Sequence, residues 1–241
     1  MPRSFSAIAS HASADPLIRR VSPLFCALLA GMLNLACLSA SAGEEFMLSR
    51  QSLARIGQDY GEQALRRISD WQAMILSSSS LDDMQKLQET NAFFNRVRFV
   101  SDIDHWGKED YWATPVQMLA SDGGDCEDFS IAKYFTLLQM GIPAERMRLT
   151  YVKALELDQA HMVLTYYSTP DAEPLVLDNL VTDIRTSSSR TDLLPVYSFN
   201  GNGLWLVKGH GMDQKVGDPE RLSRWKEVIA RISDEQSVAP P

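Results

Sequence analysis

The hydrophobic period of this chain changes once, near Pro143, and this change limits the fold more than any other feature. Before Pro143, apolar residues recur every three or four positions, which is the spacing of amphipathic helices. After it, the period becomes two in segments rich in Val, Leu, Tyr and Thr, which predicts strands. Helices followed by strands predict an α+β domain, with N-terminal helices packed on an antiparallel sheet.

Local signals refine this division. Gly57 and Gly61 predict a bend in the first helix. The acidic and aromatic stretch 101–125 is predicted to be a long loop, interrupted by a short helix that starts at Thr114-Pro115. Segment 185–190 is interpreted as a surface loop. The predicted helices are 53–75, 81–97, 126–140 and 219–233, and the predicted strands are 146–155, 160–167, 174–179, 196–199 and 204–208.

The first 42 residues have the pattern of an export signal. Two arginines precede an apolar run at 21–38, and the small residues at 40–42 form the pattern that signal peptidase requires. Residues 1–42 are therefore predicted to be a signal peptide that is removed. Residues 43–241 are predicted to form a single domain, because the chain is long enough for one large core but not for two.

A membrane anchor is the alternative interpretation of this segment. Pro23 and Asn34 interrupt the apolar run, so cleavage fits better. No segment after Leu38 is long enough to span a bilayer, so the mature protein is predicted not to span the membrane. Removing 1–42 leaves 20 basic and 30 acidic residues, a net charge of −10, which excludes nucleic acid as a partner.

Signal cleavage would also remove Cys26 and Cys37 and leave Cys126 as the only cysteine. A lone thiol in an oxidising compartment cannot form an internal disulfide, although it can be a buried, inert residue. Cys126 opens a predicted helix, where free backbone N–H groups favour a thiolate and could hold an oxyanion, with its own N–H as the first candidate. Gly123 and Gly124 before it would let the backbone approach a substrate.

A nucleophilic cysteine needs a base, and the mature chain offers His105, His161 and His210. The turn sequence 168–173 joins two predicted strands, and a hairpin centred there places His161 directly opposite Asp178. The carboxylate would then orient the imidazole, and the second ring nitrogen would face the thiol. A purely structural His–Asp pair remains the alternative, with His210 as the second candidate base and His105 as a weaker one.

Acidic residues surround the candidate nucleophile at Asp122, Asp125, Glu127 and Asp128. Acidic side chains in a first helical turn can simply complement the helix dipole. Four carboxylates beside an ionising thiol would also raise its pKa by repulsion of like charges, and a bound cation would relieve that conflict. Oxygen ligands outside the cytoplasm favour Ca²⁺, although the spacing differs from an EF-hand.

Five motifs between Trp106 and Leu180 resemble the bacterial transglutaminase-like cysteine proteases: Asp110-Tyr111-Trp112, Gly124-Asp125-Cys126-Glu127-Asp128, Tyr151-Val152-Lys153-Ala154, Ala160-His161-Met162-Val163-Leu164 and Leu175-Val176-Leu177-Asp178-Asn179-Leu180. The resemblance implies a papain-like, transglutaminase-type fold. It implies a catalytic triad of Cys126, His161 and Asp178. It also implies calcium bound by Asp125 and Glu127, with Asp128 as a further ligand.

The same resemblance implies a biological role. The protein is expected to be a periplasmic endopeptidase that cuts the N-terminal region of a large surface adhesin near a pair of alanines, which releases the adhesin and promotes biofilm dispersal. An inner-membrane receptor is expected to sequester the protease when cyclic-di-GMP is abundant. Two other classes fit the same residues: a cross-linking transglutaminase, in which an amine replaces water, and a non-catalytic module that binds calcium or a partner.

Overall fold

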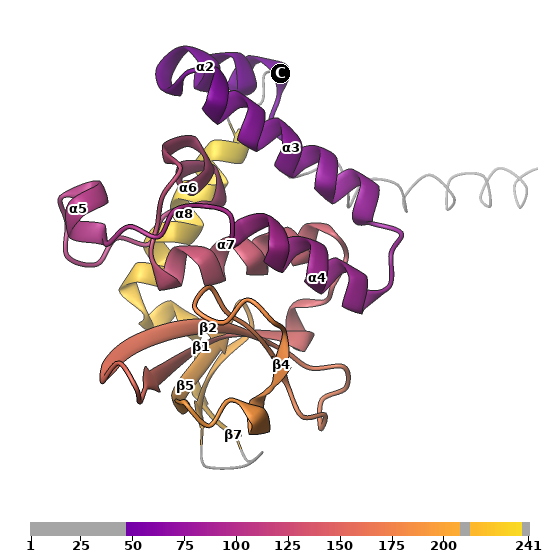
Figure 1. The fold of residues 1–241 in the computed structure, drawn as a ribbon, viewed down its shortest axis with the longest axis vertical. Helices are drawn as coiled ribbons and strands as arrows, with labels where there is room; N and C mark the ends of the chain where they lie inside the picture. The colour runs from indigo at the N-terminus through magenta and orange to yellow at the C-terminus, as the bar shows by residue number, and fades with distance from the viewer. Residues whose placement is uncertain (1–46, 208–212, 238–241) are drawn as a thin grey trace, which may run out of the picture. The chain divides into compact units, whose positions relative to one another are not determined.

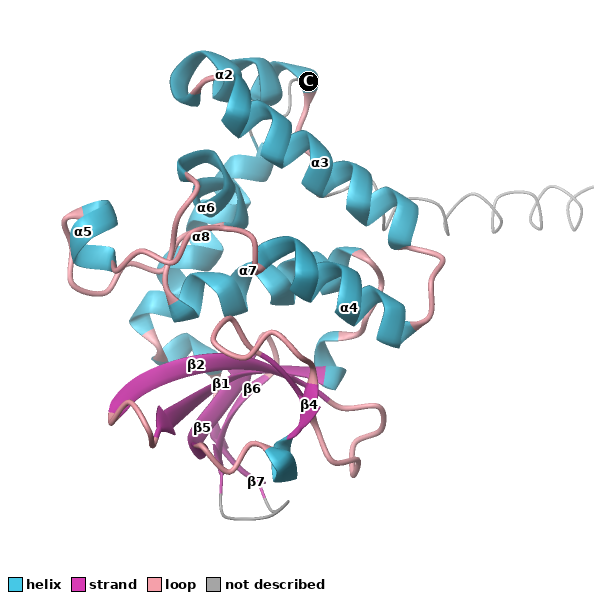
Figure 2. Ribbon diagram, in the orientation of Figure 1, coloured by secondary structure: helices cyan, strands magenta, loops and turns pink. Residues whose placement is uncertain are grey.

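A computed structural model of the protein describes residues 47–207 and 213–237. The predicted signal peptide (1–42) and His210 lie outside these residues. Within them, the helices gather on one side of a seven-stranded sheet, as Figures 1 and 2 show. The predicted α+β class is thus confirmed. None of the helices in the described part of the chain is both long and apolar enough to cross a membrane.

Most helices lie close to their predicted positions, although the last one is shifted by four residues and a short helix at 102–106 forms within the predicted loop 101–125. The bend in the first helix is a full break at Gly61, whose φ of +86° ends α2 and lets α3 start in a new direction. The helices are α2 (Arg50–Tyr60), α3 (Glu62–Ser78), α4 (Asp83–Phe94), α5 (Asp102–Trp106), α6 (Pro115–Ser121), α7 (Cys126–Gln139) and α8 (Ser223–Ser237), with 3-10 turns at Ala144–Arg146, Ser187–Ser189 and Pro219–Arg221.

Capping residues explain two of these starts. Thr114 caps α6 through a reciprocal pair of hydrogen bonds with Gln117, and Pro115 takes the first helical position, as the sequence predicts. The equivalent pair for α4 is Asp82 with Gln85. The serine run at 77–80 does not cap this helix, because α3 continues to Ser78 and Asp82 is the capping residue.

The sheet is antiparallel throughout, with the strand order β4-β3-β2-β1-β5-β6-β7. Its two outermost strands, β4 and β7, are not among the predicted strands. Both are short and pair along only one edge, so they carry little periodicity. The strands are β1 (Met147–Ala154), β2 (Gln159–Tyr166), β3 (Leu175–Leu177), β4 (Arg185–Thr186), β5 (Leu193–Asn200), β6 (Gly203–Val207) and β7 (Asp213–Gly217).

Helix α7 packs against β2 and β1 of the sheet and against α4 and α6, which buries it on nearly every side (Figure 1). Its apolar residues join Leu149 and Leu164 of the sheet and Trp71 of α3 in one continuous core. Val163, which neighbours Leu164 and so points to the opposite face, packs in a small separate cluster with Val152 and Val176. A helix held in this way gives its first residue a fixed position against the sheet.

Candidate active site

Cys126 is the first residue of α7, and its thiol is partly buried. Burial raises the pKa of this thiol strongly, and the charges of Glu127 and Asp125 raise it further, while the backbone N–H of Met162 opposes them. The Sγ atom lies 3.0 Å from Oε2 of Glu127 and donates to it. The predicted rise in the pKa of the thiol from its acidic neighbours is therefore present, and burial is the larger cause of the rise.

His161 and Asp178 form a buried pair. Nε2 of His161 lies 2.8 Å from Oδ1 of Asp178, and the two residues are 2% and 1% exposed. The bond to the carboxylate uses Nε2, so Nδ1 is the nitrogen left for another partner. The predicted contact is thus present in the structure.

The register that led to this contact is wrong by two residues. Leu164 pairs with Leu177, and β3 ends there, so Asp178 would lie opposite Val163 rather than opposite His161. A shift of two residues keeps both side chains on the same face of the sheet, whereas a shift of one would have separated them. Diagonal neighbours on one face are within reach of an imidazole and a carboxylate.

Asp178 receives hydrogen bonds on both oxygens. Oδ1 also accepts from the backbone N–H of Leu180 at 3.0 Å, and Oδ2 accepts from Nη2 of Arg190 at 2.8 Å. Burial alone would raise the pKa of this carboxyl, but the hydrogen bonds and charge of His161, with the Leu180 and Arg190 contacts, lower it to about 2. Asp178 is therefore an anion at neutral pH.

A second basic side chain, that of Lys133, interacts electrostatically with the same carboxylate. Lys133 is on α7, two turns after Cys126, and is only 1% exposed. Burial lowers the pKa of its ammonium group to about 7, and the charge of Asp178 acts in the opposite direction. The amine of Lys133 thus titrates near neutrality and shares its environment with the His161–Asp178 pair.

Ser130 joins the first turn of α7 to β2. Its Oγ lies 2.9 Å from the carbonyl oxygen of Cys126 and 3.0 Å from that of Met162, so its single proton is shared between them. Met162 follows His161 directly, and the pairing of β2 with β3 ends at Leu164. The backbone of β2 is therefore open to α7 at this point, and Ser130 fixes the cysteine and the histidine relative to each other.

Acidic side chains from three segments meet beside Cys126. Carboxylate oxygens of Asp102, Asp110 and Glu127 lie within 4.8 Å of one another, as do those of Asp102, Asp125 and Asp128. Burial raises the pKa of Asp102 to about 6 and that of Asp125 to about 8, and neighbouring carboxylates add to both effects. One buried oxygen of Asp102 and one of Asp125 have no hydrogen-bond partner among the described residues. Unpartnered carboxylate oxygens that raise one another's pKa fit a hard cation such as Ca²⁺.

Asp128 and Asp122 differ from the rest of this group. Asp128 is fully buried and accepts hydrogen bonds from the backbone N–H groups of Ala113 at 2.6 Å and Asp125 at 3.2 Å, so it holds the loop before α7. Asp122 ends α6 in the left-handed region and lies 3.8 Å from both Arg67 and Arg98. The structure therefore places Asp125, Glu127 and Asp128 in the acidic cluster, with Asp128 also capping α7, and places Asp122 with the arginines.

The two glycines before Cys126 are explained by packing. A Cβ on Gly124 would lie 2.7 Å from Oδ2 of Asp128, and one on Gly123 would lie 2.7 Å from the ring of His105. Both positions therefore require glycine for contacts within the protein. His105 itself bonds Ser121 through Nε2 at 2.8 Å, and burial lowers the pKa of its ring.

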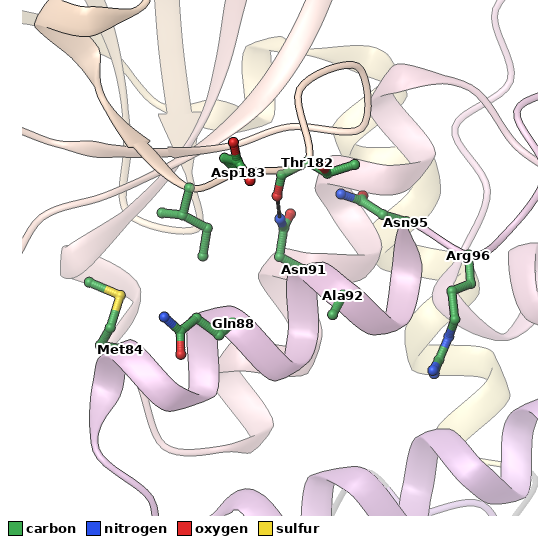
Figure 3. Close-up of a pocket in the computed structure, with 9 residues that line it drawn as sticks. Met84, Gln88, Asn91, Ala92, Asn95, Arg96, Thr182 and Asp183 are labelled. Carbon is green, nitrogen blue, oxygen red and sulfur yellow. Dashed lines mark hydrogen bonds between the residues drawn. The ribbon is translucent and has the colours of Figure 1, made fainter.

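A groove of about 570 Å³ lies next to the segment that follows Asp178 (Figure 3). It is lined by α4 and by residues 182–184, and it does not include Cys126 or His161. Asn91 donates to the carbonyl of Thr182 at 2.7 Å, as Figure 3 shows, and Asn95 donates to that of Asp178 at 2.9 Å. The walls of this groove thus anchor the loop that carries the acidic member of the pair.

The site residues that the reasoning from sequence missed include Asp102, Lys133 and Arg190. Asp102 lies in the predicted loop 101–125, where its spacing from Cys126 gives no hint of proximity. Lys133 shares a helical face with Cys126 and Ser130, at intervals of four and three residues, and that spacing is a usable signal. Arg190 lies in the predicted surface loop 185–190; that interpretation is wrong for Arg190, which is 3% exposed.

Comparisons with known proteins agree with this geometry. The model of the bacterial transglutaminase-like cysteine proteinase family matches residues 62–199. Solved structures of LapG from Legionella pneumophila are similar, at 40% sequence identity and a TM-score of 0.67, over 77% of this chain and 98% of that one. EGTA-treated LapG (40%, TM-score 0.68, 77% and 98%) and calcium-bound LapG (39%, TM-score 0.66, 77% and 99%) match as well. Among curated proteins, none matches the chain.

Proposed function

Because this chain belongs to the bacterial transglutaminase-like cysteine proteinases, we propose that it is a calcium-dependent periplasmic endopeptidase with Cys126, His161 and Asp178 as its catalytic triad. The observation that carries this proposal is the buried His161–Asp178 pair, tied through Met162 and Ser130 to the helix that Cys126 opens.

Each residue has a defined role in the proposed reaction. His161 accepts the proton of the Cys126 thiol, and the thiolate attacks the carbonyl carbon of the scissile peptide bond. The backbone N–H of Cys126 is proposed to stabilise the resulting oxyanion. When the C–N bond breaks, His161 returns the proton to the leaving amine. Water then attacks the thioester with His161 again as base, which releases the acid product and restores the thiol, while Asp178 keeps the imidazole oriented.

The acidic cluster is proposed to bind calcium. Asp125, Glu127 and Asp102 offer the oxygens, and Asp128 contributes mainly by holding the loop. Bound there, the ion supplies positive charge that offsets the repulsion among these carboxylates. The existence of both calcium-bound and EGTA-treated structures of Legionella pneumophila LapG supports this part of the proposal.

The substrate and partners are proposed from the family resemblance of the sequence motifs. The substrate is the N-terminal region of a large surface adhesin, cut near a pair of alanines, so that proteolysis releases the adhesin and disperses the biofilm. The inhibitory partner is an inner-membrane receptor that holds the protease when cyclic-di-GMP is abundant. Residues 1–42 are proposed to direct export to the periplasm and to be removed there.

The test is incubation of the purified mature protein with the N-terminal fragment of the organism's own large adhesin, in added Ca²⁺ or in excess EGTA. Cleavage at a single site in Ca²⁺ and none in EGTA is the expected result, read by electrophoresis and mass spectrometry of the fragments. Incorporation of an added primary amine without cleavage would instead show a cross-linking transglutaminase. An intact fragment with no modification under either condition would contradict an enzymatic function towards this substrate.

A further inference from the structure

Arg190 is a buried arginine with two acidic partners. Nη2 lies 2.8 Å from Oδ2 of Asp178 and 2.7 Å from Oδ2 of Asp192, and Nε lies 2.9 Å from Oδ1 of Asp192. The side chain of Arg190 is 2% exposed, whereas that of Asp192 is 31% exposed. Asp192 thus holds the guanidinium from the solvent side, and the guanidinium presents one nitrogen to Asp178.

The two oxygens of Asp178 have separate tasks. Oδ1 accepts from His161 and from the backbone N–H of Leu180, while Oδ2 accepts from Arg190. A carboxylate held on both oxygens cannot rotate about its Cβ–Cγ bond without breaking one of these bonds. The direction in which Oδ1 meets the imidazole therefore depends on Arg190.

The charges around Asp178 make this dependence stronger. His161 faces it from β2, Lys133 from α7 and Arg190 from the segment after the 3-10 turn, with Asp192 beyond Arg190. The guanidinium of Arg190 is a permanent positive charge beside this carboxylate. A buried carboxylate without such a partner would be costly to ionise, and a protonated or rotated Asp178 would not hold the histidine in the required orientation.

We propose that Arg190 is a positioning residue for the protease reaction, which fixes Asp178 so that Asp178 can orient His161, and that Asp192 anchors Arg190 in this role. The inference rests on the proposed triad. Its alternative is a structural ion pair that only ties segment 185–192 to the sheet. The two differ in one respect: a structural pair would affect catalysis independently of Asp178, whereas a positioning residue acts only through Asp178.

A double-mutant cycle separates these possibilities. The variants are Arg190→Gln, Asp178→Asn and the double variant, in the full mature protein with saturating Ca²⁺ and the adhesin fragment as substrate. Arg185→Gln is the matched control, because Arg185 is in the same segment and pairs with Asp183 at the surface at 3.2 Å. Circular dichroism measures the folded fraction of each variant, and kcat is calculated on that fraction.

We expect Arg190→Gln to lower kcat by about ten- to hundredfold with KM unchanged, a smaller loss than Asp178→Asn causes. In the Asp178→Asn background, the same change should cause no further loss of kcat. Arg190→Lys should recover part of the activity, and Arg185→Gln should leave kcat unchanged.

Several results would overturn the inference. They are additive losses in the double variant, a wild-type kcat for Arg190→Gln, or an equal loss for Arg185→Gln. If Arg190→Gln fails to fold, Asp192→Asn becomes the test, because it removes the anchoring carboxylate and keeps Arg190. A loss of kcat that disappears in the Asp178→Asn background would support the inference. An unchanged kcat would reject it. If Asp178→Asn itself keeps full activity, the proposed triad fails, which is distinct from a failure of Arg190 alone.

Discussion

The ionised carboxylate of Asp178 should stabilise the folded protein, and Asp178→Asn should remove this stabilisation. The pKa of this carboxyl is lowered from its ordinary value of 3.8 to about 2 by its buried hydrogen bonds and charges. A lowered pKa contributes stability that is present above the ordinary pKa and is lost as the pH falls towards the folded-state pKa. The contribution is about 2 kcal/mol above pH 5, about 1 kcal/mol at pH 3 and under about 0.5 kcal/mol at pH 2.

The measurement is urea unfolding of wild type and Asp178→Asn, followed by tryptophan fluorescence, at several pH values from 6 to 3. Asparagine resembles protonated aspartate, so the difference between the two free energies of unfolding should fall by about half over this range. Other carboxyls titrate in both proteins, and their effects cancel in the difference. Asp183→Asn is the control, because Asp183 is exposed and its pair with Arg185 lies at the surface; its difference from wild type should stay near zero.

A difference for Asp178→Asn that is constant from pH 6 to pH 3 would refute this reasoning. It would mean that the effect of the substitution comes from packing or from a neutral hydrogen bond. The His161 and Arg190 contacts would then not hold the carboxylate as an anion, and the electrostatic basis of the proposed triad would be lost.

Three further predictions concern the surroundings of Cys126. EGTA should abolish cleavage and added Ca²⁺ should restore it, whereas Mg²⁺ should rescue poorly because it requires near-octahedral geometry; equal rescue by both ions in the cleavage assay would contradict this. Gly124→Ala should lower the free energy of unfolding by about 1–3 kcal/mol in urea titrations, because its Cβ would overlap Asp128; a loss below about 0.5 kcal/mol would show that the loop adapts freely. Ser130→Ala should lower the free energy of unfolding by about 1 kcal/mol and slow cleavage, because the carbonyl groups of Cys126 and Met162 lose their common donor. An unchanged cleavage rate would show that Ser130 does not position the site.

Much of the architecture follows from local sequence signals. The change of hydrophobic period near Pro143 predicts which part of the chain is helical and which forms the sheet, and Gly61 marks the break between the first two helices. Thr114-Pro115 predicts the start of α6 because a capping side chain and a fixed φ act locally. The short edge strands β4 and β7 were missed, since a few residues paired on one side carry no periodic signal.

The site was predictable only in part, because some of its contacts depend on distant segments. The contact between His161 and Asp178 follows from the hairpin, even though the predicted register is wrong by two residues, because side chains two positions apart share a face. The contact of Arg190 with Asp178 depends on how the chain returns after β4. The approach of Asp102 to Asp125 depends on the path of the loop before α7. Neither approach is encoded in a local spacing.

The central claim is that Cys126 and His161 perform the proteolysis. The most direct measurement compares cleavage of the adhesin fragment in Ca²⁺ by wild type, Cys126→Ser, His161→Ala and His210→Ala, with circular dichroism to establish that each variant is folded. We predict no product from Cys126→Ser or His161→Ala, because a hydroxyl lacks the ionisation of the thiol and the thiol lacks a base without the imidazole, and near wild-type cleavage by His210→Ala. Substantial cleavage by Cys126→Ser, or a loss of activity confined to His210→Ala, would contradict the claim.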